Sequence, residues 1–253
     1  MPPNYYDSDR AAAEYLILHY GQPEPRLPAG VAVGEAARFV PRCVSECLDA
    51  GRLPAGARAL DLGCAVGGAS FELARHCAEV IGIDASRQFI EIAGNLRVKG
   101  SVSFRYPVEG ELTRKARAVV PKEIDRRRVQ FVLGDATRPP SELGVFEVVL
   151  MSNLIDRLSH PAACLKRLPR LLKSGGQLIL VSPYSWLREY TPRARWLGGC
   201  RRGGRDVWTL AAIERLLKPH FHLARRLDLP FLIREHARKF QLGVAEASVW
   251  QRR

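Results

Sequence analysis

The chain has 253 residues, of which 47% are hydrophobic and 26% are charged, a balance typical of a folded globular protein. This length allows one large α/β domain or two small ones, and we expect a single domain over residues 1–253. No apolar run approaches about 18 residues, and no basic-then-apolar leader begins the sequence. We therefore expect a cytoplasmic protein with no membrane partner.

The formal net charge is +13, and a strongly basic surface attracts phosphate backbones. The arginines and lysines are spread along the chain, however, and we expect no exposed aromatic residues interleaved with them as a stacking platform. The basic stretches are 114–117, 126–128, 193–205 and 252–253. Nucleic acid is therefore a disfavoured partner, although an enzyme that modifies nucleic acid remains an alternative.

The cysteines show no Cys-x-x-Cys pair, and no paired histidines stand at zinc spacing. They are Cys43, Cys47, Cys64, Cys77, Cys164 and Cys200. We expect reduced thiols, mostly in the core, and no metal site. Cys43 and Cys47 are one helical turn apart, which would also suit a metal pair, but a buried helix face is favoured.

The N-terminal region begins polar and aromatic over 4–10 and then becomes helical over 11–20. The candidates for the residue that caps this helix are Asp7, Ser8 and Asp9. A second helix is expected over about 34–49, with apolar residues at helical spacing. Together these segments form an N-terminal helical cap over residues 1–50.

The stretch Arg58–Ser70 predicts a strand, a tight turn and the start of a helix. Gly63 and Gly67 lack a β-carbon, so the backbone can bend sharply there and approach a ligand, and Ala65 between them is nearly as small. Asp61 stands before the first glycine, which separates this pattern from the pyrophosphate-binding Gly-x-Gly-x-x-Gly motif. A carboxylate at this position indicates a cationic ligand.

Two further strands also end in acidic residues. The strand Glu79–Asp84 places Asp84 at about the distance expected for a ribose-binding carboxylate, and the strand from Val129 ends in Gly-Asp135-Ala. Alternatively, each aspartate only caps the helix that follows it. Three acidic strand ends in this order favour the nucleotide-binding interpretation.

Residues 100–128 are long for a connection and contain apolar residues of their own, so we expect an insertion near the rim of the pocket. A fourth strand over 146–151 ends in Ser152–Leu158. Because ligands bind beyond the carboxyl ends of the strands in an open α/β sheet, Asn153 and Asp156 are expected where cofactor and acceptor meet.

A helix over 161–172 and a strand over 177–182 lead into an aromatic stretch, which we treat as an insertion over 183–209 that builds the acceptor pocket. The strands 221–232 and 244–250 then form an antiparallel hairpin. The charged residues between them, 234–241, are typical of a solvated turn.

Asp61-Leu-Gly-Cys-Ala-Val-Gly67, Asp84 and Gly-Asp135-Ala resemble the class I S-adenosylmethionine (SAM) methyltransferases. The resemblance implies an α/β Rossmann-like fold: a mostly parallel seven-stranded sheet with an antiparallel C-terminal hairpin and helices on both faces. It also implies that the glycine loop passes the methionine part of SAM, that Asp84 holds the ribose and that Asp135 faces the adenine. The implied cofactor-binding residues are Asp61, Gly63, Cys64, Ala65, Gly67, Asp84, Ala85, Asp135, Ala136, Asn153 and Leu154.

A closer resemblance extends over nearly the whole chain, to the 4-mercaptohistidine (5-thiohistidine) methyltransferase of ovothiol biosynthesis. The motifs that carry it are Asn4-Tyr-Tyr-Asp7, Asn153-Leu-Ile-Asp-Arg157, Ser182-Pro-Tyr-Ser-Trp186, Trp196-Leu-Gly-Gly199 and Arg234-Glu-His-Ala-Arg-Lys239. The implied reaction moves the SAM methyl group to the π nitrogen of 5-thiohistidine, giving ovothiol A and S-adenosylhomocysteine, without a metal. In many organisms this domain follows a sulfoxide synthase; here we expect a separate sulfoxide synthase to supply the thiol.

This resemblance and general chemistry together give the candidate substrate residues. Asn153, Asp156 and Tyr184 are the catalytic candidates, because hydrogen bonds must fix the imidazole tautomer, and Asp156 is a possible proton acceptor. The substrate-binding candidates are Tyr5, Tyr6, Asn153, Asp156, Tyr184 and Trp186, with Arg234 or Arg238 for a carboxylate and Glu189 or Glu235 for an ammonium. For these last four, surface salt bridges are the alternative. Alternative acceptors are histidine or a selenium analogue, and a basic RNA-associated methyltransferase is a further alternative.

Overall fold

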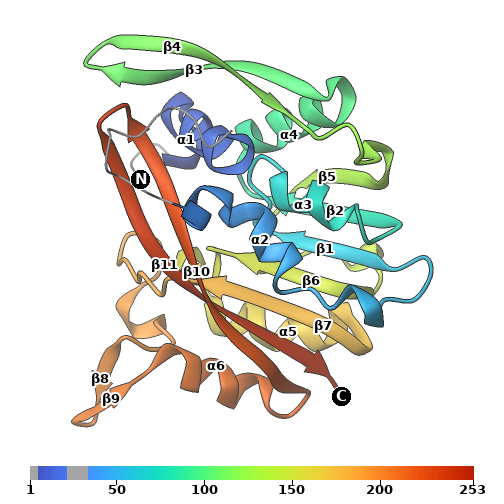
Figure 1. Cartoon of the computed structure of the whole chain (residues 1–253). Coiled ribbons are helices and arrows are strands. Elements are labelled where there is room, and N and C mark those ends of the chain that lie inside the picture. Colours follow the sequence, from blue (N-terminus) through green and yellow to red (C-terminus); the bar gives the residue numbers. More distant parts are fainter. Residues whose placement is uncertain (1–4, 22–33) are drawn as a thin grey trace.

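The central element is a seven-stranded sheet in the order β10-β11-β7-β6-β1-β2-β5 (Figure 1). The computed structural model describes residues 5–21 and 34–253. The strands are β1 (Arg58–Leu62), β2 (Glu79–Asp84), β5 (Val129–Leu133), β6 (Phe146–Ser152), β7 (Leu172–Ser182), β10 (Phe221–His236) and β11 (Lys239–Arg252). The pairs from β7 to β5 are parallel, and β11 is antiparallel to both β7 and β10. The predicted sheet is therefore confirmed.

Helices cover both faces of this sheet, as predicted. They are α1 (Asp9–Tyr20), α2 (Phe39–Ser45), α3 (Gly68–Leu73), α4 (Arg87–Lys99), α5 (Pro161–Leu171) and α6 (Thr209–Leu217). Neighbouring residues of β6 point to opposite faces: Val148 and Leu150 pack with α1 to α4, whereas Val149 and Met151 pack with α5 and α6. No helix in the described ranges is long and apolar enough to cross a membrane.

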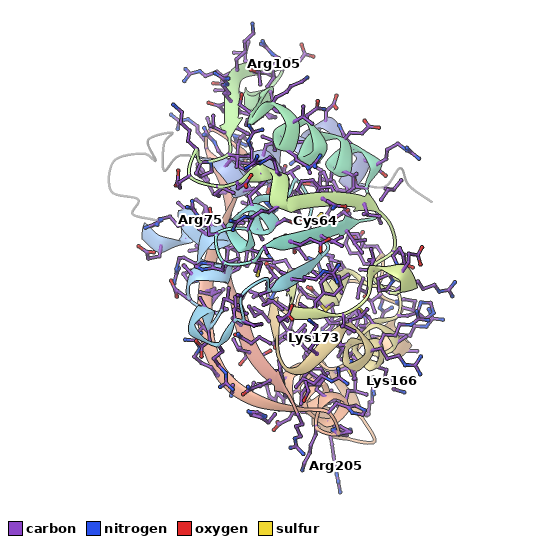
Figure 2. The ribbon with its side chains drawn as sticks, turned by 90° about the vertical axis from the view of Figure 1, so that its right-hand side faces the viewer. Cys64, Arg75, Arg105, Lys166, Lys173 and Arg205 are labelled. Atoms are coloured by element: carbon purple, nitrogen blue, oxygen red, sulfur yellow. The ribbon has the colours of Figure 1, made fainter. Side chains whose placement is uncertain are left out.

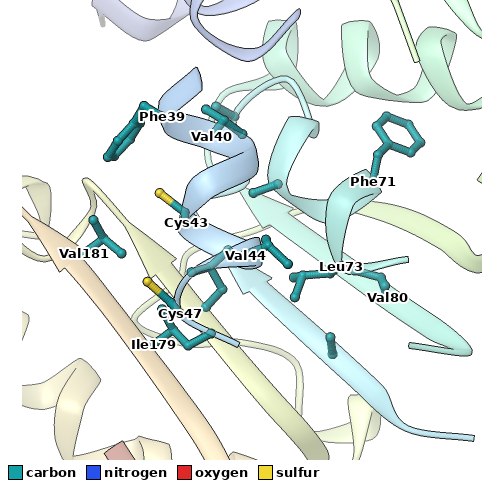
Figure 3. Close-up of a cluster of buried hydrophobic side chains, with 14 of the residues drawn as sticks. Phe39, Val40, Cys43, Val44, Cys47, Phe71, Leu73, Val80, Ile179 and Val181 are labelled. Atoms are coloured by element: carbon teal, nitrogen blue, oxygen red, sulfur yellow. The ribbon is translucent and has the colours of Figure 1, made fainter. Parts of the chain in front are cut away.

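The thiols of Cys43 and Cys47 lie in the core between α2 and the sheet (Figure 3). Burial raises the pKa of the Cys47 thiol to about 12 and that of Cys43 further still. This is the buried helix face that the spacing favoured. Among residues 5–21 and 34–253, no group of His, Cys, Asp and Glu is placed to hold a metal.

The N-terminal cap is described only in part. Ser8 caps α1, since its hydroxyl oxygen accepts the backbone N–H of Ala11 at 3.2 Å. The expected second helix begins as a 3-10 turn, Gly34–Arg38, before it becomes α2. Asn4 and residues 22–33 of the cap lie outside the described residues.

The two proposed insertions each contain a small hairpin outside the main sheet. Residues 100–128 fold into β3 (Ser101–Glu109) and β4 (Leu112–Val119), which lie over α1 and α4 (Figure 1). Residues 183–209 contain β8 (Cys200–Arg202) and β9 (Arg205–Val207).

The charged connection near the C-terminus differs from the expected solvated turn. Strand β10 continues to His236, and Arg234 and Glu235 are only 6% and 7% exposed. The Arg234 guanidinium packs on the ring of Tyr106 at 4.9 Å, and the Glu235 carboxylate accepts from Arg10 at 2.9 Å. For Arg234 and Glu235 the prediction was wrong, because contacts with the N-terminal helix and the β3–β4 hairpin bury this end of the strand, whereas Arg238 and Lys239 at the turn are exposed.

Asp61 on β1 is a buried carboxyl group, with 1% of the residue exposed. Its Oδ2 accepts the hydroxyl of Ser70, at the start of α3, at 2.6 Å. Burial raises the pKa of Asp61 to about 7, although the Ser70 hydrogen bond opposes the shift. The strand and the helix on either side of the glycine loop are thus joined beneath it.

This pKa shift predicts how stability depends on pH. The unfolded chain releases the Asp61 proton near 3.8, whereas the folded chain holds it until about 7, so the free energy of unfolding should fall as the pH rises between these values. Asn has no proton to release, so the free energy of unfolding of Asp61→Asn should not show this fall. In urea denaturation, the difference in free energy of unfolding between Asp61→Asn and the unmodified chain should shift by on the order of 2 kcal/mol in favour of the variant from pH 5 to pH 8. Asp228→Asn, an exposed position, is the control. Parallel pH curves for Asp61→Asn and the unmodified chain would contradict the assignment.

Candidate functional site

A cavity of about 250 Å³ lies at the carboxyl ends of the parallel strands. Of the residues predicted to hold the cofactor, all except Gly67 line it. These lining residues are Asp61, Gly63, Cys64, Ala65, Asp84, Ala85, Asp135, Ala136, Asn153 and Leu154. The order of the strands explains this convergence, because β5, β2, β1 and β6 are neighbours and their ends meet at one edge of the sheet.

The glycine loop is held by backbone hydrogen bonds to the next strand. The N–H groups of Gly63 and Cys64 both donate to the carbonyl of Ile83, at 2.8 and 3.0 Å. Gly63 and Gly67 have φ values of +74° and +84°, where side chains are strained. A β-carbon on Gly67 would lie 2.5 Å from the ring of Phe131. Gly67 therefore allows close packing behind the loop and does not face the cavity.

Asp84 joins the glycine loop to the turn after β2. Its two carboxylate oxygens accept the N–H groups of Ala65 and Ser86, both at 2.9 Å. The cap of α4 is Ser86, whose hydroxyl oxygen accepts the N–H of Phe89 at 3.1 Å. Asp84 is thus not the helix cap that the alternative required, and its carboxylate borders the cavity. Burial raises the pKa of Asp84, and these backbone hydrogen bonds oppose the shift.

Asp135 borders the cavity and also stabilises a local turn. Its oxygens accept the N–H and the hydroxyl of Thr137, both at 2.7 Å. A carboxylate has about four lone-pair sites, so it retains the capacity to accept from a ligand.

The first helix is fixed to the glycine loop by two residues that the sequence analysis missed. His19 Nδ1 accepts the N–H of Gly68 at 3.0 Å, and the hydroxyl of Tyr20 donates to the carbonyl of Val66 at 2.7 Å. Burial lowers the pKa of His19 to about 3, so the ring is neutral and can accept.

Aromatic rings form one wall of the cavity. Tyr6 was predicted there, whereas Tyr15, Phe89 and Tyr190 were missed. The ring centroid of Tyr6 lies 6.0 Å from that of Tyr15 and 5.8 Å from that of Tyr190. Tyr5, in contrast, does not line the cavity, since its hydroxyl donates to the Glu14 carboxylate.

Two polar residues, Ser152 and Asn153, line the cavity at the end of β6, and Asn153 has the more unusual geometry. Its backbone N–H donates to the carbonyl of Val181 at 2.8 Å, and its φ of +51° is unusual for a residue with a side chain. The side-chain Oδ1 is buried and has no hydrogen-bond partner. A buried unsatisfied acceptor is destabilising, so a strained residue that carries one points to a ligand that donates to it.

Arg157 is the arginine that lines the cavity, and the sequence analysis did not assign it a role. Its Nη1 donates to the carboxylate of Asp156 and to the carbonyl of Ser185, both at 2.8 Å. The guanidinium carbon lies 5.1 Å from the ring centroid of Tyr190. These contacts hold a planar cation at the aromatic wall.

Asp156 and Tyr184 do not line the cavity. Asp156 is fully buried, and its carboxylate accepts from Arg157 and from the hydroxyl of Ser182, which is 3.2 Å away. Burial raises the pKa of Asp156, and burial and Glu246 raise that of Tyr184. Asp156 therefore contacts the cavity-lining Arg157 without lining the cavity itself.

The remaining predicted substrate residues also lie elsewhere. Trp186 is buried, and its indole N–H donates to the hydroxyl of Thr209 at 2.9 Å. Glu189 and Arg238 are exposed, and Arg234 and Glu235 pack on the N-terminal helix and the β3–β4 hairpin, as described above. Sequence patterns could not distinguish these positions from Arg157, because the distinction depends on how distant segments pack.

Comparison with known sequences identifies the family. The model of the methyltransferase domain family matches residues 33–220. The ubiquinone biosynthesis O-methyltransferase of Xanthomonas oryzae pv. oryzae (strain PXO99A) is 29% identical over 126 residues, which is 50% of this chain and 43% of that protein. The protein of the same description from Xanthomonas campestris pv. campestris (strain B100) is 30% identical over 125 residues, 49% and 42% of the two chains. The chain thus matches less than half the length of these relatives.

Several solved structures share the fold at low sequence identity. The [4+2]-cyclase SpnF has a TM-score of 0.59 and 17% identity, covering 97% of this chain and 93% of its own. Magnesium protoporphyrin IX methyltransferase from Synechocystis PCC 6803, with bound S-adenosylhomocysteine, has a TM-score of 0.55 and 18% identity, covering 97% and 96%. Because one of these proteins is named a cyclase, the fold alone does not determine the reaction.

The residues at the cavity fit SAM. The Asp84 carboxylate can accept from ribose hydroxyls, and Gly63, which lines the cavity without a side chain, permits a close approach of the ligand to the backbone. Asp61, Asp84 and Asp135 all line the cavity, and a cationic ligand would favour the charged form of these carboxyl groups. The chain belongs to the methyltransferase domain family, within the class I SAM-dependent methyltransferases, and SAM is its cofactor.

Proposed function

We propose that this chain transfers the methyl group of SAM to the π nitrogen of 5-thiohistidine, giving ovothiol A and S-adenosylhomocysteine. The observation that carries the proposal beyond the family is the buried, unpartnered Oδ1 of Asn153 in an aromatic cavity beside Arg157. A neutral imidazole with its hydrogen on the τ nitrogen can donate to Oδ1. The π lone pair is then left free for methylation.

The demand on the protein in such a reaction is mainly positional. SAM supplies an electrophilic methyl group, and a neutral imidazole nitrogen is already a nucleophile. The residues of the chain must hold the ring in line, which can contribute roughly 7 kcal/mol or more. Asn153 would fix the tautomer, while the rings of Tyr6 and Tyr190 would limit the orientation of the imidazole and exclude water.

We assign the substrate carboxylate to Arg157, in place of Arg234 or Arg238. The Nη1 atom of Arg157 already donates to Asp156 and Ser185, which fixes the guanidinium while leaving other N–H groups available. Anchoring the carboxylate there would orient the ring and help to keep the thiolate, a competing nucleophile, away from the methyl group.

A phenolic oxygen is the second candidate acceptor, because the Xanthomonas relatives are O-methyltransferases of ubiquinone biosynthesis. A phenol must lose its proton before or during transfer, so this reaction needs a general base. His19 is a poor base, because its Nδ1 already accepts from Gly68 and burial lowers its pKa to about 3. The imidazole acceptor avoids this requirement.

The proposal is tested by the identity of the methylated product. The purified chain, SAM and one acceptor at a time should give fastest turnover with 5-thiohistidine, and NMR should locate the new methyl group on the π nitrogen. Histidine, the selenium analogue and a catechol are the comparison acceptors. Faster turnover of the catechol, or methylation of sulfur, would replace the proposed substrate without affecting the assignment of the cofactor.

Asp84→Ala tests the cofactor end of the cavity. Hydrogen bonds to a charged group contribute about 1.5–3 kcal/mol, so the dissociation constant for SAM in calorimetry should rise roughly 10- to 100-fold. Asp228→Ala, on the exposed face of β10, is the matched control and should bind as the unmodified chain does. A change of less than twofold in a folded Asp84→Ala variant would refute this role.

Arg157→Lys tests the acceptor end, because lysine keeps the charge but loses the planar pair of donors. The KM for 5-thiohistidine should rise roughly tenfold, with little change in SAM binding. With the decarboxylated acceptor, the variant and the unmodified chain should have similar KM values, since no carboxylate is present to be lost. Arg188→Lys, exposed on a nearby loop, is the control. An equal KM increase with both acceptors would exclude a carboxylate contact.

A further inference from the structure

The β3–β4 hairpin has one cationic face. Cross-strand pairing sets Arg105 opposite Lys115 and Ser103 opposite Arg117, and these four residues alternate with inward-facing ones. All four are exposed. We call Arg105, Lys115 and Arg117 the cationic strip.

The opposite face of the hairpin is the one that packs on the protein. Val102 and Phe104 contact the core, and Tyr106 lies beneath the Arg234 guanidinium. The aromatic side chains of the hairpin are therefore used in packing against the rest of the protein, and they leave the other face to polar and charged residues. None of its residues lines the SAM cavity, so the methyltransferase function does not explain the strip.

The arginines of the strip are held by hydroxyl groups and not by carboxylates. Arg105 Nε donates to Thr113 Oγ1 at 2.7 Å, and Arg117 Nη2 donates to Ser101 Oγ at 2.6 Å. The hairpin's two acidic residues, Glu109 and Glu111, are at its turn. The positive charge of the strip is thus left unneutralised.

The strip continues into a groove of about 930 Å³, in which Arg117 is also a lining residue. Arg97, Lys99 and Lys122 add further positive charge, and the Nε of Arg97 is buried with no partner. The two carboxylates of the groove are already bound: Glu123 accepts from Arg75 at 3.0 Å, and Asp125 accepts from Arg127 at 2.9 Å. The groove therefore extends the cationic surface toward the end of α4.

We propose that the cationic strip and this groove bind the phosphate backbone of a nucleic-acid duplex. Arginine, lysine and hydroxyl side chains are the groups that contact phosphates, and all three occur here. Single strands bind through stacking on exposed aromatic rings, which the strip lacks. A protein partner would require a more apolar centre to the interface. The binding is independent of sequence, and it accounts for part of the +13 charge.

The test measures duplex binding by fluorescence anisotropy at several salt concentrations, with DNA and RNA duplexes of equal length. The double variant Arg105→Gln, Lys115→Gln should bind more weakly, and its slope of log affinity against log salt for DNA should be smaller by about 2. Turnover of the small-molecule acceptor should stay unchanged, so this result is independent of the proposed function.

The matched control is Lys166→Gln, Arg205→Gln, which removes the same charge from exposed positions far from the hairpin; Figure 2 shows Arg105 and Arg205 at opposite ends of the molecule. Trp208 is 72% exposed, so the end of the molecule that carries Arg205 is better suited than the hairpin to stack the bases of a single strand. An equal loss of affinity in the control variant would mean that the effect depends only on the net charge of the protein, which would overturn the proposal. Tighter binding of single strands or of poly-glutamate, or no duplex binding at low salt, would also overturn it.

Discussion

The hydrogen bonds of the Asp84 carboxylate connect the parts of the site. One oxygen accepts from Ala65 in the glycine loop and the other from Ser86 in the next turn. The Ser86 hydroxyl in turn lies 2.9 Å from the carbonyl of Tyr6, in the N-terminal segment. Asp84 thus joins the glycine loop directly to the turn after β2, and Ser86 links that turn to the N-terminal segment. Asp84 is also the side chain that faces the ribose in our account.

Backbone strain collects at the same edge of the sheet. The non-glycine residues with positive φ among those described are Ala65, Asn153 and Tyr184, and they follow β1, β6 and β7. Such conformations cost on the order of 1–3 kcal/mol each, so the surrounding packing must stabilise them. Ala65 and Asn153 both line the cavity, so two of these three strained residues lie where a ligand can bind.

Sequence patterns were sufficient where the signal was local. The strand ends at Asp61, Asp84 and Asp135 and the Ser8 cap follow from short-range rules, because each depends on a few neighbouring residues. His19 and Tyr190 were missed because their place at the cavity depends on how a helix and a distant loop pack. The error at Arg234 and Glu235 has the same origin: charge composition predicts solvent exposure unless a tertiary partner is known.

The two ends of the cavity differ in the same way, because one depends on local sequence motifs and the other on how distant segments pack. The cofactor end of the cavity is built from motif residues, whereas the acceptor end that we propose joins Tyr6 from the N-terminal cap, Asn153 and Arg157 from the turn after β6, and Tyr190 from the 183–209 insertion. Changes in the N-terminal cap, the turn after β6 or the 183–209 insertion can alter the acceptor while the cofactor site stays the same. This separation explains how one fold serves many reactions.

The most direct test is a crystal structure of the chain with S-adenosylhomocysteine and 5-thiohistidine. Our account predicts the ribose hydroxyls at the Asp84 carboxylate and the imidazole between Tyr6 and Tyr190, with its τ nitrogen at Asn153 Oδ1. An acceptor bound outside this cavity, or an imidazole turned with its sulfur toward the cofactor, would contradict it.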